Sequence, residues 1–142
     1  MNNENRSHCE YIAKTLEAYY NGQMYRCPEC GDEFHIDDAI EIEGGFRCPH
    51  CDNTDIENDF EQLSLYDYFD DYYNLEYRIE SDRKTLRSVQ IMVACGGPNI
   101  YIDTASKAVE LYWWSDRADY PLSYEVCNAI DEMFQELWDM GC

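Results

Sequence analysis

Four cysteines in two pairs carry the clearest chemistry in this sequence. Cys27 and Cys30 form the first pair, Cys48 and Cys51 form the second, and both pairs have the spacing C-x-x-C. Two thiolates on one tight turn can hold a metal ion together, and two such turns complete a closed tetrahedral site. The 17 residues between the pairs fall in the range typical of zinc sites. We therefore expect these four cysteines to bind a structural Zn²⁺ ion.

The sequence around the two pairs is itself repeated. YRCPEC, residues 25–30, corresponds to FRCPHC, residues 46–51. Two hairpin turns related by an approximate two-fold axis would have this pattern. The segment from Gln23 to Asn53 resembles the zinc-ribbon class with rubredoxin-like knuckles, which implies metal binding and no particular function.

Other uses of the cysteines fit the sequence less well. Two disulfides would need an oxidising compartment, and a thioredoxin-like site has a single C-x-x-C. Iron in a four-thiolate site remains open. His35 and His50 could serve as ligands, but four thiolates already satisfy zinc, so we expect both histidines at the surface. Four cysteines also leave no open coordination position for catalysis, and Cys95 has no obvious histidine partner, so we do not expect an enzyme.

Net charge is the unusual property of the whole chain. Thirty acidic and ten basic residues give −20 over 142 residues, more than solubility requires. Such a field repels nucleic acids and anionic membranes and attracts basic proteins. From Gly22 to Asn58 two arginines face ten acids, which disfavours a ribbon that binds nucleic acid directly. The chain has no apolar run long enough to span a membrane and no secretion signal at its start, so we expect a cytoplasmic protein.

The segment SLYDYFDDYY, residues 64–73, has three aspartates, five aromatic residues and no base. On a helix predicted over residues 61–74, Asp67, Asp70 and Asp71 share one face at positions i, i+3 and i+4. Carboxylates at that spacing lie about 5–6 Å apart, close enough to imitate a short row of phosphates. An ordinary solvated helix face is the alternative, and no calcium or magnesium motif is present.

The remaining elements follow from hydrophobic periodicity and turn residues. We expect helices over residues 7–20, ended by Gly22, and 123–140, capped by Ser123. The residues expected to pack inward are Ile12, Leu16, Tyr19 and Tyr20 on the first helix and Val126, Ile130, Met133, Phe134 and Leu137 on the second. Strands are expected over residues 75–80, 86–95, 100–104 and 108–114, and a loop over 115–121. One of Trp113 and Trp114 should lie in the core, because neighbouring residues on a strand face opposite sides.

Together these elements predict an α+β fold, a four-stranded antiparallel meander with helices and an inserted zinc ribbon. The predicted divisions are an N-terminal helix (1–22), the zinc ribbon (23–58) and an acidic α+β domain (59–142).

Residues 64–140 contain the clustered acids and tyrosines and the segments ACGGPNIYIDT (94–104) and VELYWW (109–114). In these features they resemble small phage and mobile-element inhibitors. These are the anti-CRISPR and anti-restriction DNA mimics. The resemblance implies a bacterial cytoplasm and a target such as a CRISPR effector nuclease, whose arginines read a short DNA motif and would pair with aspartates. The expected partner-binding residues are Asp67, Asp70, Asp71, Tyr66, Tyr68, Asp59 and Glu61. Typical members need no metal, so the ribbon would be a second contact surface or a homodimer interface.

Two functions are therefore expected from the sequence. The first is an acidic inhibitor that binds a basic nucleic-acid-binding protein and blocks DNA binding by imitating the charge of DNA. The alternative is a zinc-ribbon adaptor or regulator that mediates protein contacts without competing with DNA. Competition between the chain and DNA for the partner distinguishes them.

Overall fold

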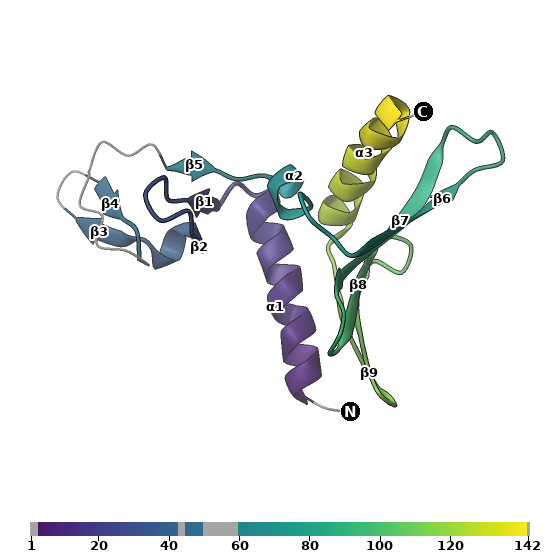
Figure 1. Ribbon diagram of the computed structural model, residues 1–142, viewed down its shortest axis with the longest axis horizontal. Helices are drawn as coiled ribbons and strands as arrows, with labels where there is room; N and C mark the ends of the chain where they lie inside the picture. The colour runs from purple at the N-terminus through teal and green to yellow at the C-terminus, as the bar shows by residue number, and fades with distance from the viewer. Residues whose placement is uncertain (1–2, 43–44, 50–59, 142) are drawn as a thin grey trace. The chain divides into compact units, whose positions relative to one another are not determined.

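The computed structural model describes residues 3–42, 45–49 and 60–141 (Figure 1). Two compact units divide the chain: Met1–Glu17 with Phe69–Cys142 form the larger unit, and Ala18–Tyr68 form the smaller one. Helix α1 (Asn3–Tyr20) contributes residues to both. The class is mixed α+β, as predicted.

Helix α1 ends where the sequence indicated and begins four residues earlier than predicted. Gly22 has φ +72°, the left-handed conformation common after a helix, and Gln23 N donates to the Ala18 carbonyl at 2.9 Å. Ile12 and Leu16 are buried. Tyr20, which was expected inward, is 45% exposed, so that prediction was wrong.

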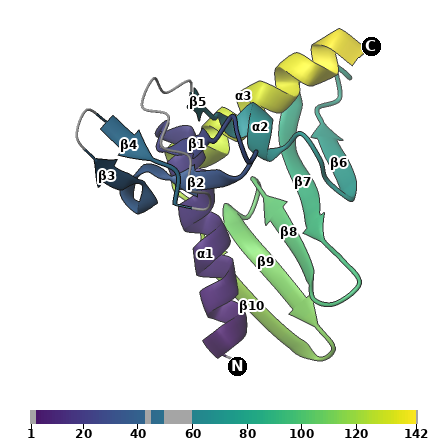
Figure 2. The ribbon, with the colours of Figure 1, turned by 60° about the vertical axis from the view of Figure 1, so that its left-hand side comes forward.

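The larger unit contains a five-stranded antiparallel sheet, so the predicted four-stranded meander lacked one strand. Its strands are β6 (Asn74–Ile79), β7 (Leu86–Ala94), β8 (Asn99–Asp103), β9 (Ala108–Trp113) and β10 (Asp116–Pro121). Figure 2 shows them side by side in the order β10-β9-β8-β7-β6, in which each strand pairs with the next one in the chain.

Strand β10 is the one that the sequence did not indicate, since residues 115–121 were expected to form a loop. It pairs with β9 from Asp116↔Trp113 to Pro121↔Ala108. Its charged residues are typical of a sheet edge, and proline at the end of an edge strand removes no necessary donor. Only Ala118 of this strand is buried, so the strand has little apolar pattern to recognise.

Alternation along the strands separates an apolar face of the sheet from a polar one. The buried apolar face is formed by Val89, Ile91, Ile100, Ile102, Val109, Leu111 and Ala118. On the polar face, Arg78 donates to both carboxylate oxygens of Asp103, each at 3.0 Å. Ala105 N also donates to Asp103, at 2.8 Å. These bonds compensate the burial of a carboxylate that is only 5% exposed.

Helix α3 (Tyr124–Gly141) packs on β7. Val126 N donates to Ser123 Oγ at 3.3 Å, which confirms the predicted cap. Gln135 accepts from Leu86 N at 2.7 Å and donates to the Lys84 carbonyl at 2.9 Å. The buried residues of α3 are Val126, Ile130, Met133 and Phe134. Leu137, also expected inward, is 39% exposed.

The smaller unit is built from very short strands. The three-stranded sheet has the order β2-β1-β5 and consists of β1 (Met24–Arg26), β2 (Glu33–His35) and β5 (Glu61–Gln62). A 3-10 turn, η1 (Ile36–Asp38), leads to a second hairpin of β3 (Ile40–Ile42) and β4 (Gly45–Arg47). Strands of two or three residues contribute few hydrogen bonds, so this unit needs other stabilisation.

Helix α2 (Leu65–Tyr68) is a single turn, so the helix predicted over residues 61–74 was wrong at both ends. Glu61 lies in β5, opposite Arg26. Tyr73 N donates to the Met92 carbonyl at 2.9 Å, which commits the following residues to β6. Because a residue cannot be helical and paired in a sheet at once, the helix cannot extend to residue 74. Helix α2 ends at Tyr68, so Asp70 and Asp71 lie beyond it.

Candidate metal centre

Three of the four predicted ligands come together. The Sγ atoms of Cys27, Cys30 and Cys48 all lie within 4.8 Å of one another, and those of Cys30 and Cys48 are 3.7 Å apart. A tetrahedral site with Zn–S bonds of about 2.3 Å has S···S distances of about 3.8 Å. The cluster therefore has the dimensions needed to bind a metal ion. Cys51, the fourth predicted ligand, lies outside the described residues.

The turn between β1 and β2 brings Cys27 and Cys30 to the same side. Gly31 N donates to the Cys27 carbonyl at 2.9 Å, and Cys27 N donates to the Asp32 carbonyl at 3.0 Å. Gly31 has φ +76°, a conformation that glycine adopts without steric cost. The sequence C-x-x-C-G thus closes a tight turn with both thiols available to one ion.

Apolar side chains surround the buried side of the cluster. Cys27 and Cys48 have no exposed surface and Phe34 is 3% exposed, whereas Cys30 faces solvent. Phe34 stacks against Tyr25 with ring centroids 6.5 Å apart and meets Phe60 edge-on at 5.5 Å. Water is therefore excluded from two sulfurs, and an ion would reach the cluster from the Cys30 side.

A polar network that the sequence analysis did not identify braces the hairpin. Arg26 reaches Glu33 at 3.1 Å and Glu61 at 3.3 Å, which links all three strands of the small sheet. Tyr19 donates its hydroxyl to Glu33 Oε2 at 3.0 Å. Burial, followed by the Glu33 charge, raises the pKa of Tyr19, so the phenol stays a donor at neutral pH. The end of α1 is thus tied to the strands that carry the first cysteine pair.

The other described cysteines lie apart from this cluster. Cys9 and Cys127 are buried in the larger unit, where burial raises the pKa of each thiol to about 11. Both thiols stay protonated and unreactive at neutral pH. Cys95 is exposed on the turn between β7 and β8.

The exposed charge on the described part of the smaller unit is mostly negative. Its exposed charged residues, among those that the structure describes, are Glu29, Asp32, Glu33, Asp37, Asp38, Glu41 and Glu61. Arg26 and Arg47 are the basic residues of this unit. The Arg26 side chain is 37% exposed and is paired with Glu33 and Glu61, and Arg47 is half-buried. Exposed carboxylates therefore outnumber exposed basic side chains among the described residues of this unit.

Of the predicted partner-binding residues, Asp70 and Asp71 are exposed and Tyr66 is 49% exposed. Glu61 is exposed and paired with Arg26. Asp59 lies outside the described part of the chain. These side chains do not share a helix, so the regular carboxylate spacing expected from the sequence is not formed.

Asp67 and Tyr68 have local structural contacts instead. The Asp67 carboxylate accepts from Ser64 N at 2.7 Å and from Ser64 Oγ at 3.2 Å, and the first of these is the bond that an acidic side chain in the first helical turn makes in a capping box. Tyr68 packs edge-on against the Tyr19 ring at 5.2 Å. Both residues are half-buried, which leaves less of each side chain for a partner.

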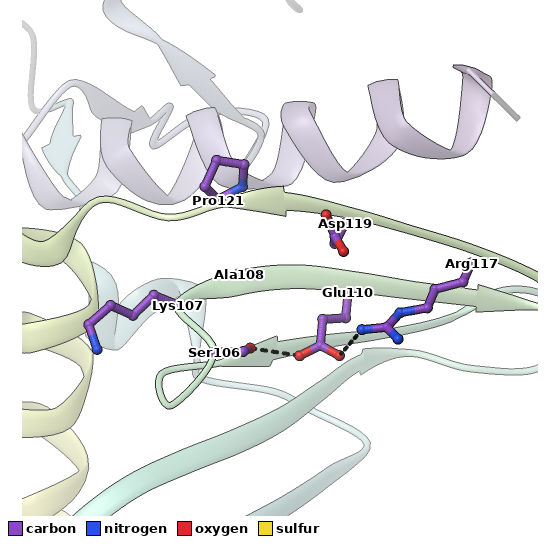
Figure 3. Close-up of a pocket in the computed structure, with 7 residues that line it drawn as sticks. All are labelled: Ser106, Lys107, Ala108, Glu110, Arg117, Asp119 and Pro121. Carbon is purple, nitrogen blue, oxygen red and sulfur yellow. Dashed lines mark hydrogen bonds and ion pairs between the residues drawn. The ribbon is translucent and has the colours of Figure 1, made fainter. Parts of the chain in front are cut away.

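A separate hollow lies on the polar side of the larger sheet (Figure 3). It has a volume of about 260 Å³ and is lined by Ser106, Lys107, Ala108, Glu110, Arg117, Asp119 and Pro121. The Glu110 carboxylate accepts from Ser106 Oγ at 2.7 Å and from Tyr112 OH at 2.6 Å, and Arg117 approaches it at 3.9 Å. The Glu110 hydrogen bond raises the pKa of Tyr112. Both oxygens of the carboxylate are thus engaged within the protein.

No protein-family model matches this chain, and comparisons with curated proteins and with solved structures find no significant match. In the described part of the chain, no helix is long and apolar enough to cross a membrane. The similarity to acidic inhibitors of host defence therefore stays a prediction from sequence. The cysteine cluster and the charge of the smaller unit are the features on which a functional proposal can be built.

Proposed function

We propose that this chain is an acidic inhibitor that binds a basic nucleic-acid-binding protein, a CRISPR effector nuclease in the first instance. It blocks DNA binding by offering carboxylates where the partner expects phosphates. The observation that supports this proposal is the excess of exposed carboxylates on the described part of the smaller unit, within a chain of net charge −20.

The physical basis is competition for arginines. A groove that reads DNA presents arginine and lysine side chains, and carboxylates form charge-assisted hydrogen bonds with both. Opposite net charges accelerate the encounter. Because the aspartates of residues 64–73 do not form one helical row, the proposed contacts are the ribbon carboxylates and, as a separate patch, Asp70 with Asp71. Binding should weaken as salt screens these charges.

The proposed metal is a structural Zn²⁺ ion held by Cys27, Cys30, Cys48 and Cys51. Its first role is to stabilise hairpins whose strands are too short to be stable by themselves. Its second role is electrostatic, since four thiolates and one Zn²⁺ carry a formal charge of −2. The loaded ribbon is therefore more acidic than the residue count alone indicates.

The test is a competition measurement with a purified, guide-RNA-loaded CRISPR effector nuclease. The apparent Kd of the nuclease for a duplex carrying its target motif is measured at increasing concentrations of the chain. A competitive inhibitor raises this Kd in proportion to its concentration, without a ternary complex. A nuclease that holds DNA and the chain together would contradict DNA mimicry.

Matched charge variants locate the surface. One variant combines Glu29→Gln, Asp38→Asn and Glu41→Gln on the ribbon, and a second combines Asp70→Asn with Asp71→Asn. The control, Glu17→Gln with Glu125→Gln and Glu132→Gln, changes the net charge as much as the first variant does, at exposed sites of the larger unit. We expect the first two variants to inhibit less than the control. Losses that follow only the number of charges removed, with the control equal to the first variant, would indicate net charge alone, without a defined surface.

The alternative is a zinc-ribbon adaptor that binds a basic protein without displacing DNA. The capping role of Asp67 favours it, because that carboxylate already accepts two hydrogen bonds from Ser64. A stable ternary complex of chain, partner and DNA would identify an adaptor.

A further inference from the structure

Trp114 occupies a position that is unfavourable for folding in two ways. It lies in the two-residue turn between β9 and β10, where Trp113 pairs with Asp116. Its side chain is 89% exposed, and its φ is +56°. Such a turn position normally carries glycine, asparagine or aspartate, and a bulky residue in this conformation is an outlier. Exposure of the indole and strain in the backbone both oppose folding, so the residue must be explained otherwise.

The Trp114 indole contacts the ring of the preceding tryptophan. The Trp113 ring meets the Trp114 ring edge-on, with centroids 6.0 Å apart. Trp113 itself leans on the turn between β7 and β8, since a Cβ built on Gly97 would lie 3.5 Å from Trp113 Cζ3. Figure 2 shows both turns at the same end of the sheet. Trp113 is therefore positioned by contacts on two sides, which lowers the entropy lost when a partner covers it.

We propose that Gly97, Trp113 and Trp114, which we call the tryptophan tip, form an anchor that inserts into an apolar pocket bordered by arginine or lysine on the partner protein. This inference rests on the basic partner of the proposed function and names the side chains that would hold it. Tryptophan is enriched among the few residues that dominate binding energy, and the face of an indole attracts cations.

Charge at the tip selects the kind of occupant. The two turns, residues 95–99 and 113–116, contain no lysine or arginine, and Asp116 is exposed. Arg117, the next residue, lies over the Tyr112 ring and approaches Glu110 at 3.9 Å, so its charge is directed to the polar face of the sheet. In a chain of net charge −20, this surface repels nucleic acids and anionic membranes. A protein surface with cations around an apolar pocket is complementary to both the indole and the neighbouring carboxylate.

If the tryptophan tip binds a partner, substitution of Trp114 should weaken binding without lowering the Tm. Trp114→Gly removes both the indole and the steric cost of the left-handed backbone, so its Tm should equal or exceed that of the wild type. The same change should weaken partner binding about 30-fold, as expected for a hot-spot residue. A residue kept only for the fold would show a lower Tm on substitution.

Two control variants separate the contributions. Arg83→Gly relieves a comparable backbone, with φ +60° in the turn between β6 and β7. Loss of its positive charge can only favour a basic partner. Tyr124→Ala removes an aromatic ring that is 65% exposed, from helical backbone. Neither control should weaken the affinity.

The probe is the purified, guide-RNA-loaded effector nuclease, and its Kd for each variant is measured by calorimetry, beside thermal unfolding. Weaker binding by Trp114→Gly alone, with an undiminished Tm, supports the tip. Unchanged binding by Trp114→Gly, or a clear fall in its Tm, overturns it.

DNA competition on the same samples distinguishes the two proposals. If DNA does not displace the chain but Trp114→Gly weakens binding, the tip stands and mimicry fails. If DNA competes and Trp114→Gly binds normally, mimicry stands and the tip fails. A nuclease that does not bind the wild-type chain overturns both.

Discussion

Cys30 Sγ and Cys48 Sγ lie 3.7 Å apart, although the two residues are 18 positions apart in the chain. That distance is far longer than a disulfide bond of about 2.05 Å and close to the edge of a zinc–thiolate tetrahedron. Each sulfur belongs to a different hairpin of three-residue strands. An ion shared by the two hairpins would therefore connect parts that have few other bonds.

Loss of one cluster thiolate should release the metal. We expect Cys48→Ser, purified with zinc present, to bind zinc at least about 100-fold more weakly, since changes outside the ligand set already cost 10–100-fold. Zinc content by mass spectrometry and chelator competition measure this. Cys95→Ser, at an exposed cysteine outside the cluster, should keep full zinc. Stoichiometric, tightly held zinc in Cys48→Ser would refute the assignment.

Asp67 should contribute to stability through its cap on α2. Asp67→Ala leaves Ser64 N without its 2.7 Å acceptor, and loss of such a cap costs about 1 kcal/mol. The free energy of unfolding in urea measures the effect. Asp70→Ala, beyond the helix and exposed, should change it by less than about 0.5 kcal/mol. Equal effects of the two substitutions would argue against the capping role.

The bidentate pair of Arg78 and Asp103 should be costly to break. Arg78→Ala leaves a carboxylate that is only 7% exposed in its side chain without its cation. We expect a loss of about 2–3 kcal/mol, below the full cost of a deeply buried pair because Arg78 is partly exposed. Arg87→Ala, from an exposed pair with Glu80 at 3.6 Å, should cost less than about 1 kcal/mol. Similar urea midpoints for both variants would contradict this ranking.

Asp82 should give the turn between β6 and β7 a stability that depends on pH. The Thr85 hydroxyl, with the Thr85 and Lys84 backbone amides, lowers the pKa of Asp82 from 3.8 to about 2. A lowered carboxyl pKa means that the folded state favours the ionised form. Its stabilising effect is therefore complete above pH 3.8 and is lost as pH falls towards 2.

The measurement compares urea midpoints of the wild type and Asp82→Ala from pH 6 to pH 2. The two curves should converge between about pH 4 and pH 2. When Asp82→Ala is made in a Thr85→Val background, which lacks the donating hydroxyl, the difference in urea midpoint that it causes above pH 4 should be smaller. A gap that stays constant down to pH 2 would show that the carboxylate is not responsible.

Features that depend on local spacing were predictable from the sequence. The C-x-x-C pairs predicted a cysteine cluster, and three of its members are brought together. Alternation predicted β6 to β9, and Gly22 and Ser123 marked a helix end and a helix start. A C-x-x-C turn, an alternating strand and a helix cap each depend on residues within a few positions of one another, and the repetition of the C-x-x-C turn indicated that the two pairs would meet.

Only the tertiary structure determined the conformation of two segments and the exposure of two tryptophans. The aspartates of residues 64–73 were expected on one helix, but the chain from Tyr73 onward is hydrogen-bonded to β7 instead. Residues 116–121 have little apolar pattern, and become a strand because β9 offers them an unpaired edge. Neither tryptophan lies in the core, since Trp113 is 37% and Trp114 89% exposed. Pairing across a sheet joins residues far apart in sequence, so its hydrogen bonds can override a local preference that the sequence shows clearly.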